Sequence, residues 1–439
     1  MTEWLHALID WLSANPQWLG LAIFIIACVE CLAIAGIIVP GIMLLFAVAA
    51  LAGSGALGLG ETLLLGYLGG LLGDAISYGL GRRFHQNIRR LPGLRHHPEW
   101  LAGAETYFQR YGVASLLVGR FIGPLRPMLP MVAGMLDMPL LRFIAVSLVA
   151  AAGWSVAYLL PGWAAGAAFR LPLPEGFWSE AAVVVVAVLV MIGLIVQGSL
   201  RHKRWATSLA AGLSLVLLVA LFFGWSSLHD FDQGLMALVQ EQRQATLDSL
   251  AVLVTRLGDF RTQFFAGALI TGLLLLARQW RHALFAGGTL ITTALANGAL
   301  KHLFARARPD VLAEPLSSFS FPSGHSSAAF AFFLVLGVLA GRGQPPRLRL
   351  TWMLLACLPA ASIALSRVYL GVHWPTDIIA GALLASCVCA GWLALIQRQA
   401  SLPAMSPRVW WLLLPAALAL LGGFATWALP EAFSLYRYK

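Results

Sequence analysis

The chain has 439 residues, of which 59% are hydrophobic and only 11% are charged, and its formal net charge is +10. Soluble domains carry roughly a quarter charged residues, so this composition excludes a soluble globular enzyme, a disordered protein and a nucleic-acid binder. Cationic loops that face an anionic membrane leaflet account for the basic surplus. The composition therefore predicts an all-α polytopic membrane protein.

Apolar runs separated by basic or Pro/Gly-rich segments predict eleven membrane spans, since a spanning helix needs ~20 apolar residues. The expected spans are 17–38, 61–81, 140–165, 179–200, 206–226, 262–278, 283–301, 326–341, 350–366, 376–397 and 409–429. The basic cluster at 201–204 separates two halves of different character. We therefore expect domains at 1–200 and 201–400, followed by an additional transmembrane helix and tail at 401–439.

Two further apolar stretches of the N-terminal half hold helix breakers. They are 36–57, with Pro40-Gly41, and 113–135, with Pro124, Pro127 and Pro130. Proline interrupts a helix, and irregular backbone at membrane depth is tolerated only where protein or water covers it. Both stretches are therefore predicted to be re-entrant hairpins. The arginine-rich segment 82–110 is expected in the cytoplasm, so the two hairpins enter the membrane from opposite sides. Two hairpins of opposite orientation predict an inverted repeat with a site near the bilayer midplane.

Four charged residues lie inside these apolar stretches and spans: Glu30, Asp74, Arg120 and Arg126. A charge at membrane depth costs roughly 2.5–3.5 kcal/mol or more, so it indicates a functional site. We expect the acids and the arginines to pair around a polar cavity, where the arginines bind a phosphate headgroup and the acids carry coupling protons. The alternative is that the four residues form buried pairs that only stabilise the fold.

This pattern resembles the DedA family, which is related to the VTT-type lipid scramblases. The matching features are Glu30 with Pro40-Gly41, Gly73-Asp74 with Tyr78 and Gly81, and Arg120-Phe121-x-x-Pro124-x-Arg126-x-x-x-Pro130-x-x-Ala133-Gly134. The resemblance covers about residues 15–200. It implies transport of a lipid phosphate, such as undecaprenyl phosphate, between the leaflets, and it leaves proton coupling open.

Loop charge predicts the sidedness of the C-terminal half. Segments 201–204, 278–282, 341–350 and 397–408 hold ten Lys and Arg residues and no acid. Segment 227–261 holds five acids and three arginines. The positive-inside rule places the first four segments in the cytoplasm. Loops 302–325 and 366–376 then lie on the periplasmic face of a bacterial inner membrane.

Three chemically distinctive segments fall on these outer loops. They are Lys301 with Arg308-Pro309, Pro322-Ser323-Gly324-His325, and Ser366-Arg367 with His373 and Asp377. Three cations suit a dianionic phosphate, and a helix that begins at Ser323-Gly324 offers free N–H groups to an anion. Because His373 and Asp377 are four residues apart, we expect them on one helix face, where the carboxylate can orient the imidazole for attack on phosphorus. His325 can protonate the leaving oxygen.

In order and spacing, these segments resemble the signature of the type 2 phosphatidic acid phosphatase family, over residues 206–397. The resemblance implies a six-helix membrane phosphatase that works through a phosphohistidine and needs no metal or other cofactor. It implies that His373 is the nucleophile, Asp377 its orienting carboxylate and His325 the general acid. The phosphate-binding residues that it implies are Lys301, Arg308, Ser323, Gly324 and Arg367.

The fusion of the two halves suggests a joint function. The C-terminal domain would hydrolyse a lipid pyrophosphate or phosphate at the periplasmic face, and the N-terminal domain would carry the lipid monophosphate to the cytoplasmic face. If the substrate is undecaprenyl pyrophosphate, the two activities form one cycle, because hydrolysis produces the lipid monophosphate that the transport step returns to the cytoplasmic face. The expected partners are the lipid and the bilayer, with no nucleic acid, and a homo-oligomer is left open.

Two alternatives to this joint function stay open. In the first, the protein hydrolyses phosphatidic acid or phosphatidylglycerol phosphate, and its N-terminal half is a scaffold or a dimerisation module. In the second, the protein is chiefly a transporter whose phosphatase trims the cargo. The span 409–429 lies outside both resemblances, and the sequence assigns it no role.

Overall fold

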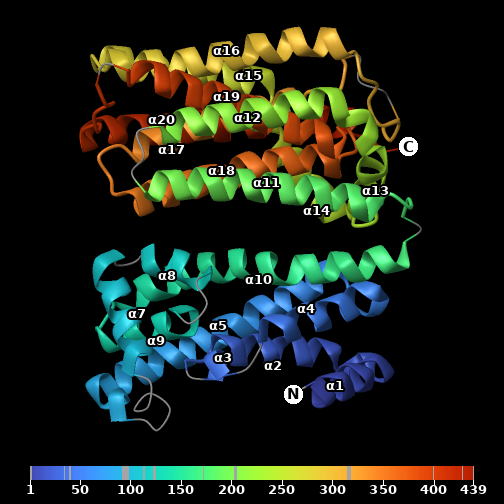
Figure 1. The fold of residues 1–439 in the computed structure, drawn as a ribbon, viewed down its shortest axis with the longest axis vertical. Coiled ribbons are helices and arrows are strands. Elements are labelled where there is room, and N and C mark those ends of the chain that lie inside the picture. The colour runs from blue at the N-terminus through green and yellow to red at the C-terminus, as the bar shows by residue number, and fades with distance from the viewer. Residues whose placement is uncertain are drawn as a thin grey trace. The chain divides into compact units, whose positions relative to one another are not determined.

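The computed structural model describes residues 2–33, 35–38, 41–90, 98–111, 114–121, 125–171, 173–201, 205–313, 318–398, 400–427 and 429–438. The chain forms two compact units, Met1–Pro172 and Leu173–Lys439 (Figure 1). Within the described ranges the regular structure is helical, apart from one isolated bridge between Leu312 and Tyr438. The predicted all-α polytopic membrane fold is therefore confirmed.

Most of the predicted spans are long helices. Over the described residues, eight helices are long and apolar enough to cross a membrane, or up to ten if each of two bent pairs is one span. The bent pairs are Ala7–Ala14 with Pro16–Cys31 and Ala245–Arg256 with Phe260–Leu276. Each of the eleven predicted spans contains a helix, but some of these helices are shorter than the ~20 residues that a straight span needs.

The first unit is built from helices of very different length. Its elements are α1 (Thr2–Ala14), η1 (Pro16–Trp18), α2 (Leu19–Cys31), α3 (Ala35–Ile38), α4 (Gly41–Leu51), η2 (Ala52–Ala56), α5 (Leu59–Phe84), η3 (His85–Arg90), α7 (Pro98–Tyr111), α8 (Ala114–Val118), η4 (Gly119–Phe121), α9 (Leu125–Met135) and α10 (Leu140–Arg170). α5 packs against α2, α9 and α10. Gly69 and Gly73 allow the close contact with α2, because a Cβ at either position would overlap a carbonyl oxygen of α2.

The two predicted hairpins consist of short helices. Residues 36–57 contain α3, α4 and η2, and residues 113–135 contain α8, η4 and α9. Proline interrupts the second stretch less than expected, because α9 continues through Pro130. Pro127 lies in the first turn of α9, where its missing N–H would have no intrahelical partner. Pro40 and Pro124 lie outside the described residues, and the re-entrant course and the inverted repeat stay predictions.

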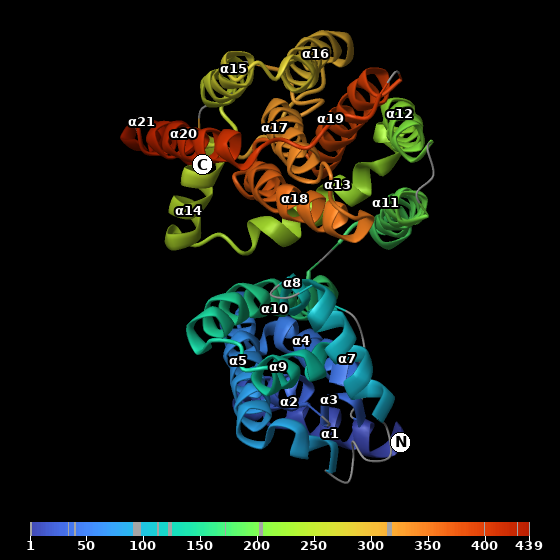
Figure 2. The ribbon, with the colours of Figure 1, turned by 90° about the vertical axis from the view of Figure 1, so that its left-hand side faces the viewer.

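The second unit is a helical bundle with α17 near its centre (Figure 2). Its elements are α11 (Phe177–Leu200), α12 (Ala206–Gly224), η5 (Trp225–Leu228), α13 (His229–Gln240), α14 (Ala245–Arg256), α15 (Phe260–Leu276), α16 (Trp280–Phe304), α17 (Gly324–Ala340), α18 (Pro346–Tyr369), α19 (Pro375–Ile396), α20 (Pro407–Thr426) and α21 (Leu429–Leu435). α17 packs against α15, α16, α18 and α19, while α12 packs against α19 and α20 against α15.

The division between the units differs from the boundary expected at 200–201. α11 belongs to the second unit because its first turn binds α13. The backbone N–H of Gly176 donates to Oδ2 of Asp230 at 2.9 Å, and the N–H of Phe231 donates to Oε2 of Glu180 at 2.8 Å. A cluster of basic residues indicates the side of the membrane on which a loop lies, and it carries no information about which helices pack together. Residues 202–204 of that cluster lie outside the described chain.

Candidate active site

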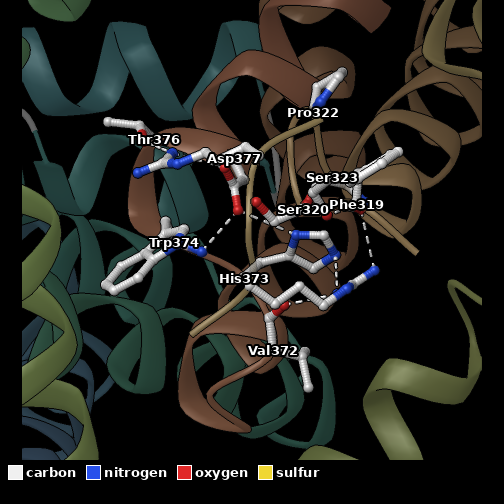
Figure 3. Close-up of polar contacts among 12 residues, drawn as sticks. Phe319, Ser320, Pro322, Ser323, Val372, His373, Trp374, Thr376 and Asp377 are labelled. Carbon is white, nitrogen blue, oxygen red and sulfur yellow. Dashed lines mark hydrogen bonds and ion pairs between the residues drawn. The ribbon is translucent and has the colours of Figure 1, made fainter. Parts of the chain in front are cut away.

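The three distinctive segments of the C-terminal half meet around one cavity. Figure 3 shows how residues of the second and third segments lie beside each other. Lys301 lies in the last turn of α16 and His325 in the first turn of α17. Arg367 lies in the last turn of α18, and Asp377 lies in the first turn of α19. Since α16 runs into α17 and α18 into α19 through connecting loops, residues separated by up to 76 positions share one site.

His373 is held between a carboxylate and a guanidinium. Its Nδ1 lies 3.3 Å from Oδ2 of Asp377, and its Nε2 lies 3.1 Å from Nη1 of Arg308. A guanidinium can only donate hydrogen bonds, so Nε2 must be the unprotonated nitrogen and Nδ1–H must donate to Asp377. The arrangement therefore leaves the lone pair of Nε2 directed at the cationic side of the site. Both His373 and Asp377 are buried.

The electrostatic surroundings keep the imidazole of His373 neutral. Burial lowers the pKa of His373 well below its usual value, and the positive charges of Arg308, Arg367 and Lys301 lower it further. Burial and the charge of Arg367 also lower the pKa of Arg308 to about 10, so this guanidinium stays protonated near neutral pH. A neutral imidazole therefore lies beside several cations.

The cations that face the site already donate hydrogen bonds to backbone and hydroxyl oxygens. Arg308 donates from Nε to the carbonyl of Ser318 at 2.7 Å and from Nη1 to the carbonyl of Val372 at 2.7 Å. Lys301 donates from Nζ to the carbonyl of Phe319 at 2.6 Å. Hydrogen bonds from such cations to phosphate oxygens are stronger than those to neutral oxygens. A bound phosphate can therefore replace these loop acceptors without leaving a cation unpaired.

The other predicted phosphate-binding residues lie at different depths. Gly324 borders the cavity that contains the site. Ser323 is fully buried at the N-terminal cap of α17, where its Oγ accepts from the backbone N–H of Ser326 at 3.4 Å and its own N–H donates to the carbonyl of Asp377 at 3.0 Å. Arg367 is also buried. The roles of Ser323 and Arg367 in binding phosphate stay predictions.

The cavity extends from the charged residues into apolar surroundings. Its volume is about 820 Å³, and Lys301, Arg308, His325 and His373 lie at its polar end. The remainder runs between α15 and α16, where the lining includes Phe264, Gly267, Gly272, Leu275, Ile291 and Leu295. A groove with a cationic end and an apolar length is complementary to an amphiphile with an anionic headgroup.

Four polar residues that the sequence analysis did not select support the two histidines. Nε2 of His325 lies 2.9 Å from Oδ1 of Asp259. Arg306 donates from Nη1 to Oδ1 of Asp377 at 2.8 Å and from Nη2 to Oδ2 of Asp232 at 2.6 Å. The same Asp232 accepts from the N–H of Thr376 at 2.8 Å. The supporting residues are Asp232, Asp259, Arg306 and Thr376.

The sequence held one signal for these supporting residues. Asp232 and Asp259 belong to segment 227–261, which loop charge placed on the same membrane face as the catalytic loops. That segment was expected to be a loop, but it forms α13, α14 and the start of α15. Pairing of these acids with residues up to 144 positions away needs the fold, because no local spacing connects them.

In the first unit the four charged residues form two buried pairs. Arg126 donates to Glu30 and Arg120 donates to Asp74. The Arg120 guanidinium also lies over the ring of Trp154, at 5.4 Å from its centroid. A Cβ at position 41 would overlap the Glu30 carboxylate, which explains the glycine there. The roles of these residues in transport stay predictions.

Neither unit offers an evident metal centre in the part of the chain that the structure describes. No group of three or more His, Cys, Asp and Glu side chains is arranged there to hold a metal ion. The five cysteines are free, and Cys31 and Cys389 are buried.

Comparison with known families matches each unit to a different family. A model of the VTT domain matches residues 39–164, and a model of the PAP2 superfamily matches residues 282–401. The first match lies within the first unit and the second within the second unit. Both matches agree with the resemblances expected from the sequence.

Individual relatives match parts of the chain. The inner membrane protein YabI of Escherichia coli is 41% identical over 152 residues, which are 35% of this chain and 60% of that protein. An undecaprenyl-diphosphatase of Sulfolobus acidocaldarius is 31% identical over 181 residues, 38% of this chain and 78% of that protein. A solved structure, a transmembrane PAP2 type phosphatidylglycerolphosphate phosphatase from Bacillus subtilis, is 27% identical with a TM-score of 0.37, and the match covers 45% of this chain and 99% of that one.

Proposed function

Since the chain belongs to the VTT-domain family through its first unit and to the PAP2 superfamily through its second, we propose that it joins hydrolysis of a lipid pyrophosphate to transport of the resulting lipid monophosphate. The second unit is a membrane lipid phosphatase domain. The proposal places its site at the periplasmic face of the inner membrane and names undecaprenyl pyrophosphate as the substrate. The first unit would carry undecaprenyl phosphate to the cytoplasmic face.

The observation that carries the phosphatase half is the hydrogen bonding of His373. Its Nε2 has the lone pair, its Nδ1–H is held by Asp377, and the cations Lys301, Arg308 and Arg367 surround it. Nε2 would attack the terminal phosphorus, forming an N–P bond as the bond to the leaving oxygen breaks. Arg308 would turn from Nε2 to the phosphate oxygens as the substrate enters.

His325 is suited to the proton transfers of this reaction. A carboxylate only accepts hydrogen bonds, so Nε2–H of His325 donates to Asp259 and Nδ1 is the nitrogen that can exchange a proton. Burial and the charge of Arg367 lower the pKa of His325 to about 4, so its imidazole is neutral in the empty site. It would take up a proton at Nδ1 when the anionic substrate binds and give this proton to the leaving oxygen. It would then take a proton from the water that attacks the phosphohistidine, which releases inorganic phosphate and restores both histidines.

The groove between α15 and α16 supports a lipid rather than a soluble phosphate ester. Its polar end holds the catalytic residues, and its apolar length follows α15 as far as Leu275. A prenyl chain is apolar along its whole length and suits this apolar lining. Rates measured with undecaprenyl pyrophosphate, phosphatidic acid and phosphatidylglycerol phosphate under one condition would rank the substrates. A clear preference for either glycerolipid would favour the alternative in which the first unit is a scaffold.

Phosphate release by the purified protein tests the phosphatase half. His373→Ala removes the nucleophile and should abolish release from undecaprenyl pyrophosphate. His229→Ala is the matched control, because His229 is exposed on α13 and takes no part in the site. Full turnover by His373→Ala would refute the assignment, whereas loss in both variants would indicate a general effect on folding.

The transport half is supported by unused hydrogen-bond donors beside the two ion pairs. Among the described residues, Nε and Nη1 of Arg126, Nε of Arg120 and Nε1 of Trp154 are buried without an acceptor. Buried donors are normally satisfied, so each such group requires an explanation. Four unsatisfied donors around two arginines suit the oxygens of a phosphate headgroup, which would occupy the site in transit.

Vesicles that carry a labelled lipid phosphate in one leaflet test this half. The label should equilibrate between leaflets faster with the protein than without it, and Arg120→Ala or Arg126→Ala should slow equilibration while phosphate release continues. Arg142→Ala is the control, since Arg142 is exposed at the start of α10. Equal rates for the wild type and both variants would leave the ion pairs with a purely structural role.

A further inference from the structure

The C-terminal segment returns to the catalytic loops although it lies beyond the matched PAP2 region, residues 282–401. α20 packs against α15, and α21 packs against α14. The tail then runs beside the loop that follows Arg308. The N–H of Ala313 donates to the carbonyl of Arg437 at 3.0 Å, and Leu312 forms an antiparallel bridge with Tyr438. The additional helix therefore delivers residues 436–438 to the edge of the site.

Tyr436 of this tail contacts a predicted phosphate-binding residue. Its hydroxyl accepts a hydrogen bond from Nη1 of Arg367 at 2.8 Å, and its ring lies under the same guanidinium, with the centroid 5.3 Å from Cζ. Nη1 also donates to Oγ1 of Thr255 in α14, at 2.8 Å. Arg367 is only 1% exposed and Tyr436 only 6%. Two hydroxyls and one ring thus enclose one side of the guanidinium.

This enclosure determines which edge of Arg367 remains for a ligand. Nη1 is bonded to both hydroxyls, whereas Nε is buried and has no acceptor within the described part of the chain. A guanidinium presents its donors in a rigid planar fork. Fixing Nη1 therefore orients the edge formed by Nε and Nη2, the edge that can bind a phosphate in bidentate geometry. Arg367 lies close enough to His373 for its charge to lower the pKa of that imidazole.

We propose that Tyr436 is a positioning residue for Arg367, so that the C-terminal helix and tail complete the phosphate site of the PAP2 unit. The proposal rests on the phosphatase function proposed above, and it gives α20 and α21 a role. Tyr436 does not touch the substrate. It acts by holding Arg367 in the one orientation that directs Nε and Nη2 at the phosphoryl group.

The test is Tyr436→Phe in the full-length protein, with orthovanadate as the probe because it mimics the phosphoryl group in transfer. The variant keeps the ring and the packing and loses only the acceptor. Tyr438→Phe is the matched control, since Tyr438 lies two residues away, is 49% exposed and stacks on Arg243 instead. A hydrogen bond to a charged group contributes more binding free energy than one between neutral groups. We therefore expect Tyr436→Phe to weaken vanadate inhibition and to raise KM about tenfold. The control should stay within about twofold of the wild type.

A second background shows whether Tyr436 acts through Arg367. The lysine of Arg367→Lys cannot bind both hydroxyls and also bind a phosphate in bidentate geometry, so Tyr436 has no guanidinium to position in that variant. Adding Tyr436→Phe to it should therefore change vanadate affinity by less than about twofold. A full further loss in that background, or unchanged KM and vanadate affinity in Tyr436→Phe, would overturn the proposal. Thermal unfolding of each variant checks that it is folded. Turnover by His373→Ala would instead refute the phosphatase assignment itself, so the two failures are distinguishable.

Discussion

Asp232 and Arg306 form a buried ion pair, with Oδ2 of the acid 2.6 Å from Nη2 of the arginine. The pair connects α13 to the carboxylate that orients His373, because the other terminal nitrogen of Arg306 donates to Asp377. Trp225 and Trp374 enclose the guanidinium, at 4.4 and 5.5 Å from its Cζ. The orientation of His373, the proposed nucleophile, therefore depends on a helix that contributes no residue to the cavity.

Arg306→Met should destabilise the protein and slow the reaction. Removing one partner of a buried ion pair typically costs about 3–5 kcal/mol, because the other charge stays buried without compensation. Here both Asp232 and Asp377 would lose their cation, so we also expect kcat to fall. Denaturant unfolding in detergent and steady-state kinetics measure the two effects. Arg398→Met, in the exposed turn after α19, should leave both unchanged, and a wild-type kcat in Arg306→Met would show that Asp377 needs no such support.

The pH dependence of kcat/KM should show an acid limb well below the usual histidine value. Neutral His373 is the active form, and its pKa is lowered by burial and by Arg308, Arg367 and Lys301. Because the pKa is lowered, the neutral form persists as the pH falls through about 6.5, and activity is lost only in more acidic solution. Titration of the substrate phosphate in the same detergent separates its ionisation from that of the enzyme.

A variant that alters the charge around His373 sharpens this prediction. Arg308→Gln removes one positive charge beside Nε2, so the residual activity of that variant should have its acid limb at higher pH than the wild type. An acid limb of the wild type centred above about 6.5 would contradict the assignment of a neutral nucleophile kept so by neighbouring cations.

Gly272→Phe should make the phosphatase selective for short lipids. Gly272 lines the groove, and a Cβ there would meet no atom within 4 Å, so we expect the variant to fold and its phenyl ring to fill the groove. It lies about 20 Å along α15 from Asp259, at 1.5 Å per residue. We expect kcat/KM to fall severalfold for undecaprenyl pyrophosphate and to stay unchanged for geranyl pyrophosphate.

The control for the groove is Gly298→Phe. Gly298 lies on α16, also has open space around it and does not belong to the cavity lining. Equal losses for long and short substrates in Gly272→Phe would mean that the lipid chain does not follow α15.

A fragment that begins at residue 173 should fold and hydrolyse its substrate, whereas one that begins at 201 should be less stable. The reason is the contact between α11 and α13: Gly176 and Glu180 bind Asp230 and the backbone of Phe231. Loss of α11 frees α13, which carries Asp232. Thermal unfolding and phosphate release compare the fragments, and equal stability would show that α11 contributes nothing to the position of α13.

Much of the phosphatase site could be predicted because its chemistry lies in short segments. The spacing of four residues predicted that His373 and Asp377 share one helix face. The structure joins them at 3.3 Å, but His373 lies in the turn before α19, because that helix begins at Pro375. Loop charge brought the Lys301, Ser323 and Arg367 segments to one face. The sequence did not predict the supporting roles of Arg306, Asp232 and Asp259. Their partners are distant in the chain, and the separation between partners follows no helical or strand period.

The sequence by itself determined the helical membrane class and the two families, and it predicted the reactive side chains. These follow from local quantities, namely the hydropathy of each run, the charge of each loop and the spacing of residues within one turn of helix. Only the tertiary structure decided where the two units divide, which nitrogen of His373 is free, and that Tyr436 reaches Arg367 across 69 residues. Such contacts depend on how helices pack, and packing energy is shared among many residues that no single motif records.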